Sequence, residues 1–242
     1  MARTILKMLL SASLATAGAL VLSTPAATAG SLQVDPIRLE INAGRRTATV
    51  RVRNQEQVPV TIRAYPLTWN QADGEDLYEE TGEVIVSPPI FTIPAGGTQI
   101  VRVGLRTPSA DPKAYRLIVE EVPQASPGNG VQVALRLNLP LFVMMPEGEQ
   151  AALAWTATRA ADGAVTLEAT NSGPGFVRVD MAAAEAATGL DIDPGFNLGT
   201  VLPGRTRRYT IPAGAPVRDP ARLTSILRTT SGAQAQLATL GN

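Results

Sequence analysis

Residues 131–143 read VQVALRLNLPLFV, and every odd position in this stretch is aliphatic. The even positions are mixed and include Gln132, Arg136, Asn138 and Pro140. A period of two indicates a β-strand with one apolar face, because successive side chains of a strand point to opposite faces. The run is longer than the usual strand of about 3–10 residues. It is therefore either a long core strand of an antiparallel sandwich or a strand that offers its aliphatic row to a partner protein.

The composition predicts an aliphatic fold with many turns. The chain has 242 residues, which is enough for one large domain or two of about 100 residues. Hydrophobic residues make up 45% of the chain and aromatic residues only 4%, so we expect a core of aliphatic side chains. The 21 Gly and 19 Pro indicate frequent turns and few long helices.

Residue types that are missing exclude several kinds of site. The chain has no His and no Cys, which removes imidazole and thiol catalysis, Ser-His triads and most zinc sites. It also lacks a phosphate-cradling Gly loop, and Asp191 and Asp193 lack the further oxygen ligands of a calcium loop. The formal net charge is zero, which does not favour a nucleic-acid partner. We expect no enzyme activity, metal or cofactor; a hydrolase that uses only carboxylates stays open, although no acid pair is spaced for it.

The first 29 residues have the pattern of a secretory signal. Arg3 and Lys7 precede an apolar stretch at 8–22, and Ala27-Thr28-Ala29 matches the A-x-A cleavage pattern. The apolar stretch is shorter than an ordinary membrane span of about 20 residues. We therefore expect cleavage after Ala29, export of the mature protein and no insertion into the membrane.

The next part of the chain alternates β runs with turn signals. Turns are predicted at Asn42-Ala43-Gly44 and at Pro94-Ala95-Gly96-Gly97, and a polar loop is predicted at Asn70–Asp76. The Pro88-Pro89 pair is a place where a cis bond can occur. The expected strands are 31–39, 47–54, 58–65, 85–93, 98–103, 115–122 and 131–143. Seven short strands without a convincing amphipathic helix are typical of an immunoglobulin-like sandwich.

A second β series follows a stretch that is predicted as a linker at 146–150. Its expected strands are 153–158, 164–170, 176–181, 205–211, 223–228 and 235–240. Pro203-Gly204-x-Thr206 before a strand echoes Pro94-Ala95-Gly96-Gly97-Thr98 before a strand, which supports a second domain of similar build. The predicted organisation is a signal peptide at 1–29, an N-terminal domain at 30–145, the linker, and a C-terminal β-sandwich domain at 151–242.

An ordered set of motifs in the first domain resembles the PapD-like family of periplasmic pilus chaperones. The motifs are Val34-Asp35-x-x-Arg38, Ser87-Pro88-Pro89, IPAGGTQIVRV at 93–103, Tyr115-Arg116 leading into Glu120-Glu121-Val122-Pro123, and the alternating run of 131–142. Each motif is weak alone, but several in the correct order are strong together. The resemblance covers roughly residues 31–146 and implies an all-β chain of two immunoglobulin-like sandwich domains, arranged at an angle with a cleft between them.

The resemblance also implies a mechanism, donor-strand complementation, in which the chaperone lends a strand to a subunit that lacks one. The aliphatic row of the donor strand then fills the open core of the subunit, and no ATP is needed. On this sequence the row falls on Val131, Val133, Leu135, Leu137 and Leu139. Burial of each such side chain contributes about 1.5–3 kcal/mol before ordering costs are subtracted.

Family members anchor the C-terminal carboxylate of the subunit with two cations in the cleft. Arg38 matches the Arg of the first strand, and a guanidinium can hold a carboxylate with two parallel hydrogen bonds. Pro140 stands where the family has a Lys near the end of the donor strand, so this chain departs from the pattern. Arg116 on the preceding strand and Arg136 on the donor strand are the candidates for the second cation, and we favour Arg116.

The expected partners are therefore pilus, fimbrial or spore-coat-like subunits and an outer-membrane usher, and the expected location is the periplasm. The free protein could also cap its own donor strand by forming a homodimer. The alternative is a secreted immunoglobulin-like structural protein or a pilus subunit. A subunit should carry an N-terminal extension and lack one strand, whereas here the residues after Ala29 lead directly into a predicted strand.

Overall fold

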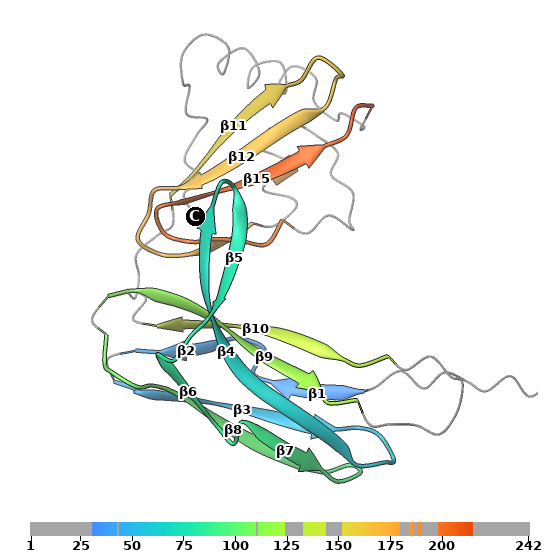
Figure 1. Ribbon diagram of the computed structural model, residues 1–242. Helices are drawn as coiled ribbons and strands as arrows, with labels where there is room; N and C mark the ends of the chain where they lie inside the picture. The colour runs from blue at the N-terminus through green and yellow to red at the C-terminus, as the bar shows by residue number, and fades with distance from the viewer. Residues whose placement is uncertain are drawn as a thin grey trace, which may run out of the picture.

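The computed structural model describes residues 31–42, 44–109, 111–123, 133–143, 152–179, 184–185, 188–189 and 198–214. These residues are almost entirely strands and turns, and they form two β units (Figure 1). The predicted signal peptide at 1–29, the linker at 146–150, Val131, and the strands predicted at 223–228 and 235–240 lie outside the described residues.

The N-terminal unit is a sandwich of two sheets. The first sheet contains, in order, β1 (Leu32–Asp35), β3 (Thr47–Asn54), β8 (Thr98–Leu105) and β6 (Val84–Ser87). The second contains, in order, β2 (Leu39–Ile41), β10 (Arg136–Val143), β9 (Lys113–Glu121), β4 (Val60–Ala72) and β5 (Glu75–Glu80), with β7 (Ile90–Ile93) paired to β4. Strand periodicity fills the space between them: Val50 and Val52 of β3 are fully buried, whereas Arg51 and Arg53 are exposed. The core is aliphatic as predicted, with Tyr115 as its one buried aromatic residue among those described.

Two stretches that were predicted as single strands are divided at prolines. The cis bond before Pro36 separates β1 from β2, and the cis bond before Pro88 separates β6 from β7. In both cases the two halves join opposite sheets of the sandwich. The chain therefore changes sheets at each of these prolines, which lack the N–H that would continue the ladder of the first sheet.

The second unit is built on a three-stranded sheet. Its strands are β11 (Leu153–Arg159), β12 (Val165–Asn171) and β15 (Arg205–Ile211), and a two-stranded sheet pairs β13 (Val177–Arg178) with β14 (Thr200–Val201). Its core is separate from that of the first unit and contains Trp155 and Tyr209, whose rings lie 6.1 Å apart.

The similarity of build that the sequence suggested has a physical counterpart in two buried asparagines. Asn54 ends β3, and its amide donates to the carbonyls of Ile93 and Pro94 in the turn before β8. Asn171 ends β12, and its amide donates to the carbonyl of Val201, shortly before β15. Each asparagine thus ties the end of one strand to the turn that precedes its neighbour.

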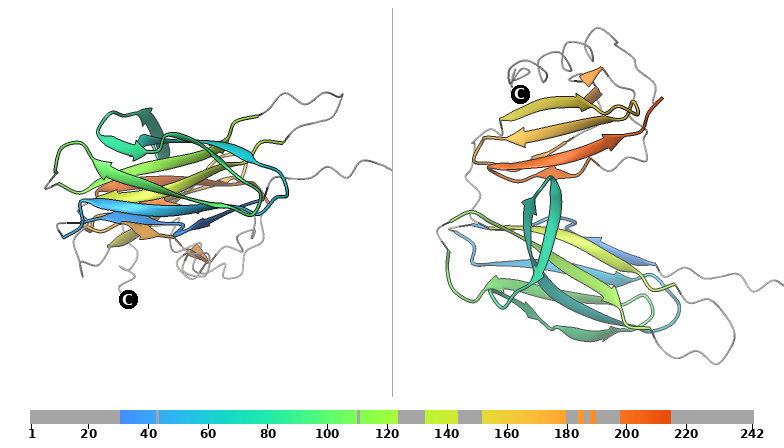
Figure 2. Two further views of the ribbon diagram at one scale, coloured as in Figure 1. Left: turned by 90° about the horizontal axis from the view of Figure 1, so that it is seen from below. Right: turned by 45° about the horizontal axis from the view of Figure 1, so that its top comes forward.

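The polar loop predicted at Asn70–Asp76 is wrong, because these residues belong to a long β-hairpin. β4 continues to Ala72, and β5 starts at Glu75. Asp73 and Gly74 have φ values of 54° and 86°, as a two-residue type I′ turn requires. The hairpin extends from the N-terminal sandwich to the sheet of the second unit (Figure 2). A Cβ on Gly74 would lie 2.4 Å from the Cβ of Arg208, so the two units approach closely there.

Candidate functional site

β10 has one paired edge and one edge that is largely open. It pairs antiparallel with β9 along its whole length, from Arg136 to Val143. On the other edge it pairs with β2 in parallel, and only at 141–143. Within the part of the chain that the structure describes, no strand lies beside that edge from Arg136 to Pro140. This segment can accept an added strand, because its outward-facing backbone groups have no ladder partner.

The register shows which backbone groups point to the open edge. The carbonyl of Leu135 accepts a hydrogen bond from the amide of Glu121 at 2.9 Å, so Leu135 faces β9. Because facing alternates along an antiparallel strand, Arg136, Asn138 and Pro140 point their backbone groups to the open edge. The N–H that Pro140 lacks would therefore lie on that edge, and its absence costs no hydrogen bond to β9.

The aliphatic row of β10 changes its environment along the strand. Val133 is 65% exposed, and Leu135 and Leu137 are half-buried. Leu139 is only 6% exposed, and Leu141 is fully buried. The strand begins at Arg136, later than the predicted start at residue 131. The row is thus accessible at its upstream end and belongs to the core of the domain at its downstream end, including Leu139.

Arg38 lies at the junction of the two units. It sits in the short segment between β1 and β2, and its side chain is 56% exposed. One of its terminal nitrogens lies 2.9 Å from a carboxylate oxygen of Glu40. Its guanidinium carbon lies 5.7 Å from the ring centroid of Phe176, which belongs to the second unit. Because the ion pair is exposed to solvent, it holds Arg38 weakly and a carboxylate ligand can compete for it.

Arg116 lies directly opposite Pro140 in the register of β9 and β10. Its guanidinium carbon lies 3.5 Å from the ring centroid of Trp69, and its buried Nε has no hydrogen-bond partner. Burial lowers the pKa of Arg116, and attraction to Tyr78 and Asp76 opposes this effect. A guanidinium remains charged at neutral pH, so Arg116 is a half-buried cation. Arg116 therefore places a positive charge directly across the ladder from Pro140, the position where the family resemblance implies a Lys.

An aromatic cluster connects the two arginines. Phe142 and Phe176 stack with their ring centroids 3.6 Å apart, and the rings of Trp69 and Phe142 are 5.8 Å apart. Arg38 contacts the Phe176 end of this cluster, and Arg116 contacts the Trp69 end. Both cations therefore lie along one aromatic surface between the units, and beside it is a cavity of about 380 Å³ that both units line.

Arg136, the other candidate for the second cation, is already paired. Its Nε lies 3.6 Å from a carboxylate oxygen of Glu120. The same carboxylate is near Arg63 at 3.8 Å, and it accepts a hydrogen bond from the hydroxyl of Tyr65 at 3.1 Å. This ion pair is exposed like that of Arg38, so it holds Arg136 only weakly. Arg136 differs from Arg116 in position, because it lies opposite Glu120 in the register whereas Arg116 lies opposite Pro140.

Sequence reasoning missed the aromatic cluster and the hairpin that carries Trp69. The Asp73-Gly74 dipeptide is a strong hairpin signal and could have identified β4 and β5. The cluster has no comparable signal, because Trp69, Phe142 and Phe176 are far apart in the sequence. Within the described ranges, no group of three or more acidic side chains is placed to hold a metal ion. The same ranges contain no helix that is long and apolar enough to cross a membrane.

Residues 31–148 match the family described as pili and flagellar-assembly chaperone, PapD N-terminal domain. Over these residues the chain is therefore similar to the N-terminal domain of PapD-like chaperones. The resemblance that the sequence motifs suggested is thereby confirmed, and a chaperone role is supported. No curated protein matches the sequence.

Solved structures of PapD-like chaperones share the fold over both units. A chain of the CsuC–CsuE chaperone–tip adhesion subunit pre-assembly complex from archaic chaperone-usher Csu pili of Acinetobacter baumannii is 24% identical, with a TM-score of 0.61 over 76% of this chain and 89% of that chain. The E. coli chaperone DraB is 19% identical, with a TM-score of 0.52 over 76% and 87%. A chain of the Salmonella enterica SafA pilin–SafB chaperone complex is 16% identical, with a TM-score of 0.54 over 76% and 86%. The predicted fold of two immunoglobulin-like sandwiches at an angle is confirmed.

Proposed function

We propose that this protein is a periplasmic chaperone that binds pilus or fimbrial subunits by donor-strand complementation and passes them to an outer-membrane usher without ATP. The observation that carries the proposal is the open edge of β10 at Arg136–Pro140, next to the exposed end of its aliphatic row. An open edge supplies backbone hydrogen bonds to an added strand, and the row supplies side chains for the core of the subunit.

The subunit-binding row in this proposal consists of Val131, Val133, Leu135 and Leu137. Val133 is exposed and Leu135 is half-buried outside the core cluster, whereas Leu137 is half-buried and packs against that cluster. Leu139 packs in the core of the N-terminal unit itself, so the proposed subunit-binding row ends before it. The same open edge is available to a second copy of the chain, so a self-capped homodimer is the form that we expect without subunit.

Arg38 and Arg116 are the proposed anchor for the C-terminal carboxylate of the subunit. Arg116 lies opposite Pro140 and has no carboxylate partner among the described residues, so it can supply the cation that position 140 lacks. A hydrogen bond between charged groups contributes about 1.5–3 kcal/mol. That range corresponds to roughly 10- to 150-fold in affinity.

Replacement of Arg116 with alanine is therefore expected to weaken capture of a subunit by roughly 10- to 150-fold. The measurement is the affinity for a subunit with a free C-terminal carboxylate and for the same subunit with an amidated C-terminus. The difference between the two forms should be smaller in Arg116→Ala than in the unmodified chain, and Arg38 should account for what remains of it. Arg136→Ala is the matched control, because Arg136 lies opposite Glu120 in the register and not opposite Pro140; an equal loss in both variants would contradict the assignment of Arg116.

The function itself is tested by expression of the tagged full chain and identification of the proteins that co-purify from the periplasm by mass spectrometry. A partner whose sandwich lacks one strand supports the proposal. Purification of the protein from the periplasm with no such partner, in cells that produce pilus subunits, would count against it. The alternative of a secreted structural protein predicts no subunit partner under the same conditions.

A further inference from the structure

The β4–β5 hairpin forms hydrogen bonds with backbone groups of the second unit. Gln71 is only 2% exposed, and both ends of its side-chain amide bind the second unit. Its nitrogen donates to the carbonyl of Thr200 at 2.7 Å, and its oxygen accepts from the amide of Leu202 at 2.9 Å. The carbonyl of Gly74 accepts from the amide of Arg208 at 2.9 Å. These contacts tie the hairpin to the strands β14 and β15 and to the turn between them.

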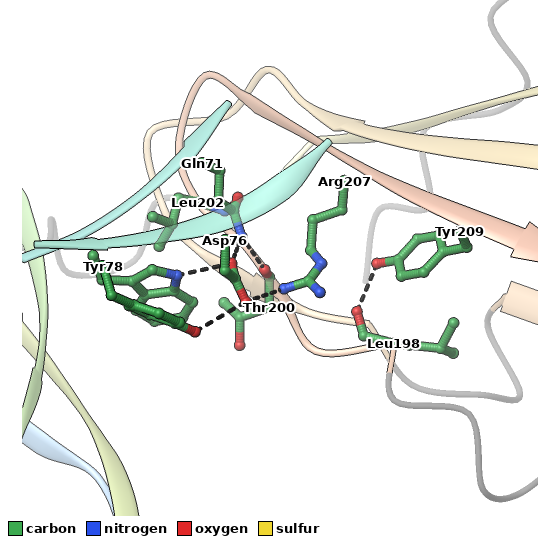
Figure 3. A network of polar contacts seen from close by, with 9 residues as sticks. Gln71, Asp76, Tyr78, Leu198, Thr200, Leu202, Arg207 and Tyr209 are labelled. Atoms are coloured by element: carbon green, nitrogen blue, oxygen red, sulfur yellow. Dashed lines mark hydrogen bonds and ion pairs between the residues drawn. The ribbon is translucent and has the colours of Figure 1, made fainter. Parts of the chain in front are cut away.

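Asp76 is the centre of a polar network that spans both units (Figure 3). From its own hairpin it accepts hydrogen bonds from the indole of Trp69 at 2.8 Å, from Gln71 at 2.7 Å and from the hydroxyl of Tyr78 at 3.1 Å. From the second unit, the guanidinium of Arg207 donates to the same carboxylate. The side chains of Arg207 and Asp76 are 12% and 17% exposed, so this ion pair is largely desolvated.

The same network reaches the proposed carboxylate anchor. Arg116 stacks on the ring of Trp69, and the indole nitrogen of that ring is held by Asp76. Arg116 also lies 5.9 Å from the ring centroid of Tyr78, whose hydroxyl donates to Asp76. The two aromatic rings beside Arg116 are therefore both oriented by one carboxylate, and that carboxylate is also bound to the second unit.

We infer that Asp76 is a positioning residue that couples the docking of the second unit to the placement of Arg116 for the subunit carboxylate. The inference rests on the proposed function, because it concerns the same anchor. When the second unit is docked, Arg207 and Asp76 form their ion pair, and Trp69 and Tyr78 hold the guanidinium of Arg116 at the junction. When the units separate, Arg207 no longer holds the carboxylate of Asp76. Asp76 then fixes the rings of Trp69 and Tyr78 less firmly.

The energetics of removing Asp76 favour this coupling. Without its carboxylate, Arg207 would be a largely buried cation with no ion-pair partner among the described residues, and its Nε already lacks a hydrogen-bond partner. A buried charge that loses its partner strongly destabilises the arrangement that buries it. The docked arrangement is the one affected, because separation of the units returns Arg207 to water.

Acidification should loosen the docking through Asp76. Burial alone would raise the pKa of Asp76, but hydrogen bonds from Gln71 and Trp69 and the charge of Arg207 outweigh burial and hold it below its usual value of 3.8. A carboxylate with a lowered pKa stabilises the arrangement above its ordinary pKa, and this contribution is lost as the pH falls through the lowered value. The charged groups that interact with Asp76 are Arg207 and Arg116, and the neutral titratable groups are Tyr78 and Tyr209. Docking should therefore be constant above about pH 5 and weaken below about pH 4, and Asp76→Asn should lack this dependence.

The coupling is tested with two measurements on the full chain. Because the chain has no cysteine, Thr49→Cys and Thr158→Cys introduce two exposed labelling sites, one on each unit, and the distance distribution between spin labels reports docking. Asp76→Ala should broaden this distribution in the free protein and should weaken subunit capture by roughly tenfold, within the usual range of coupling between sites. Glu75→Gln, an exposed residue of the same hairpin, is the matched control and should change neither quantity.

The outcomes separate this inference from the proposed function. An unchanged distance distribution in Asp76→Ala would overturn the docking role. A broadened distribution with unchanged subunit capture would overturn the coupling and leave the proposed function intact. Arg116→Ala should weaken capture without broadening the distribution, which a purely structural role of Arg116 would not produce. If the unmodified chain captures no subunit, the proposed function fails, and the coupling to the anchor fails with it.

Discussion

Replacement of Leu135 with aspartate is expected to abolish the capture of a pilus subunit while the chain remains folded. Leu135 is half-buried, lies before the first residue of β10 and is outside the core cluster of the N-terminal unit. In the proposed complex its side chain enters the core of the subunit, where an aspartate would lose about 1.5–3 kcal/mol of apolar burial and would also place a charge in an apolar site. Since each 1.4 kcal/mol is tenfold, capture should fall by more than about 100-fold.

The measurement is the amount of subunit recovered with the tagged chain from a periplasmic extract, relative to the unmodified chain. Ala134→Asp is the matched control, because it adds the same charge at an exposed neighbouring position that is not part of the aliphatic row. Circular dichroism should show the same β content for both variants. Unchanged recovery with Leu135→Asp would contradict the donor-strand assignment.

The corresponding substitution at Leu141, six positions further along the row, should destabilise the fold. Leu141 is fully buried and lies between β9 and β2 in the second sheet of the sandwich. Leu141→Asp would remove its apolar burial and would place an unpaired carboxylate in the core, at a combined cost of about 4 kcal/mol or more. Natural domains have a free energy of unfolding of about 5–15 kcal/mol, so this variant should lose most of its stability.

Urea unfolding followed by tryptophan fluorescence measures this loss. Trp69 lies at the junction and Trp155 in the core of the second unit, so a variant with Trp155→Phe reports mainly on Trp69. Asn138→Asp adds the same charge at an exposed position of β10 and should leave the unfolding midpoint within experimental error. A normal midpoint for Leu141→Asp would mean that the downstream part of the row is not required for the core.

These two variants locate the change of role along one continuous pattern. The sequence shows an unbroken alternation from Val131 to Val143, and it predicted the strand, its apolar face and the resemblance that explains it. It could not show at which residue the side chains of the row change from proposed contacts with a subunit to contacts in the core of the domain. That position depends on where the row packs into the core of the sandwich, which also contains Leu39 and Ile41 of β2. β2 is far away in the sequence, and its parallel pairing has no local signal.

The anchor illustrates the same limit. Sequence alignment with the family could identify Arg38 and could show that Pro140 carries no charge. It left Arg116 and Arg136 as alternatives, because strand register is not visible in a single sequence. The register places Arg116 opposite Pro140 and Arg136 opposite Glu120. The hairpin that carries Trp69 beside Arg116 was assigned to a loop, although Asp73-Gly74 marked its turn.

The partial pairing of β2 with β10 also limits how far an added strand can extend along β10. A strand that is added to the open edge can extend along β10 only as far as Pro140, because β2 occupies the edge from Leu141 onward. From Arg136 to Pro140 this edge is roughly 15 Å long at about 3.3 Å per residue. Pro140 offers a carbonyl but no N–H, so the last position of the added ladder has an acceptor and no donor. In the proposed complex, β2 would therefore fix the register in which the strand of the subunit pairs with β10.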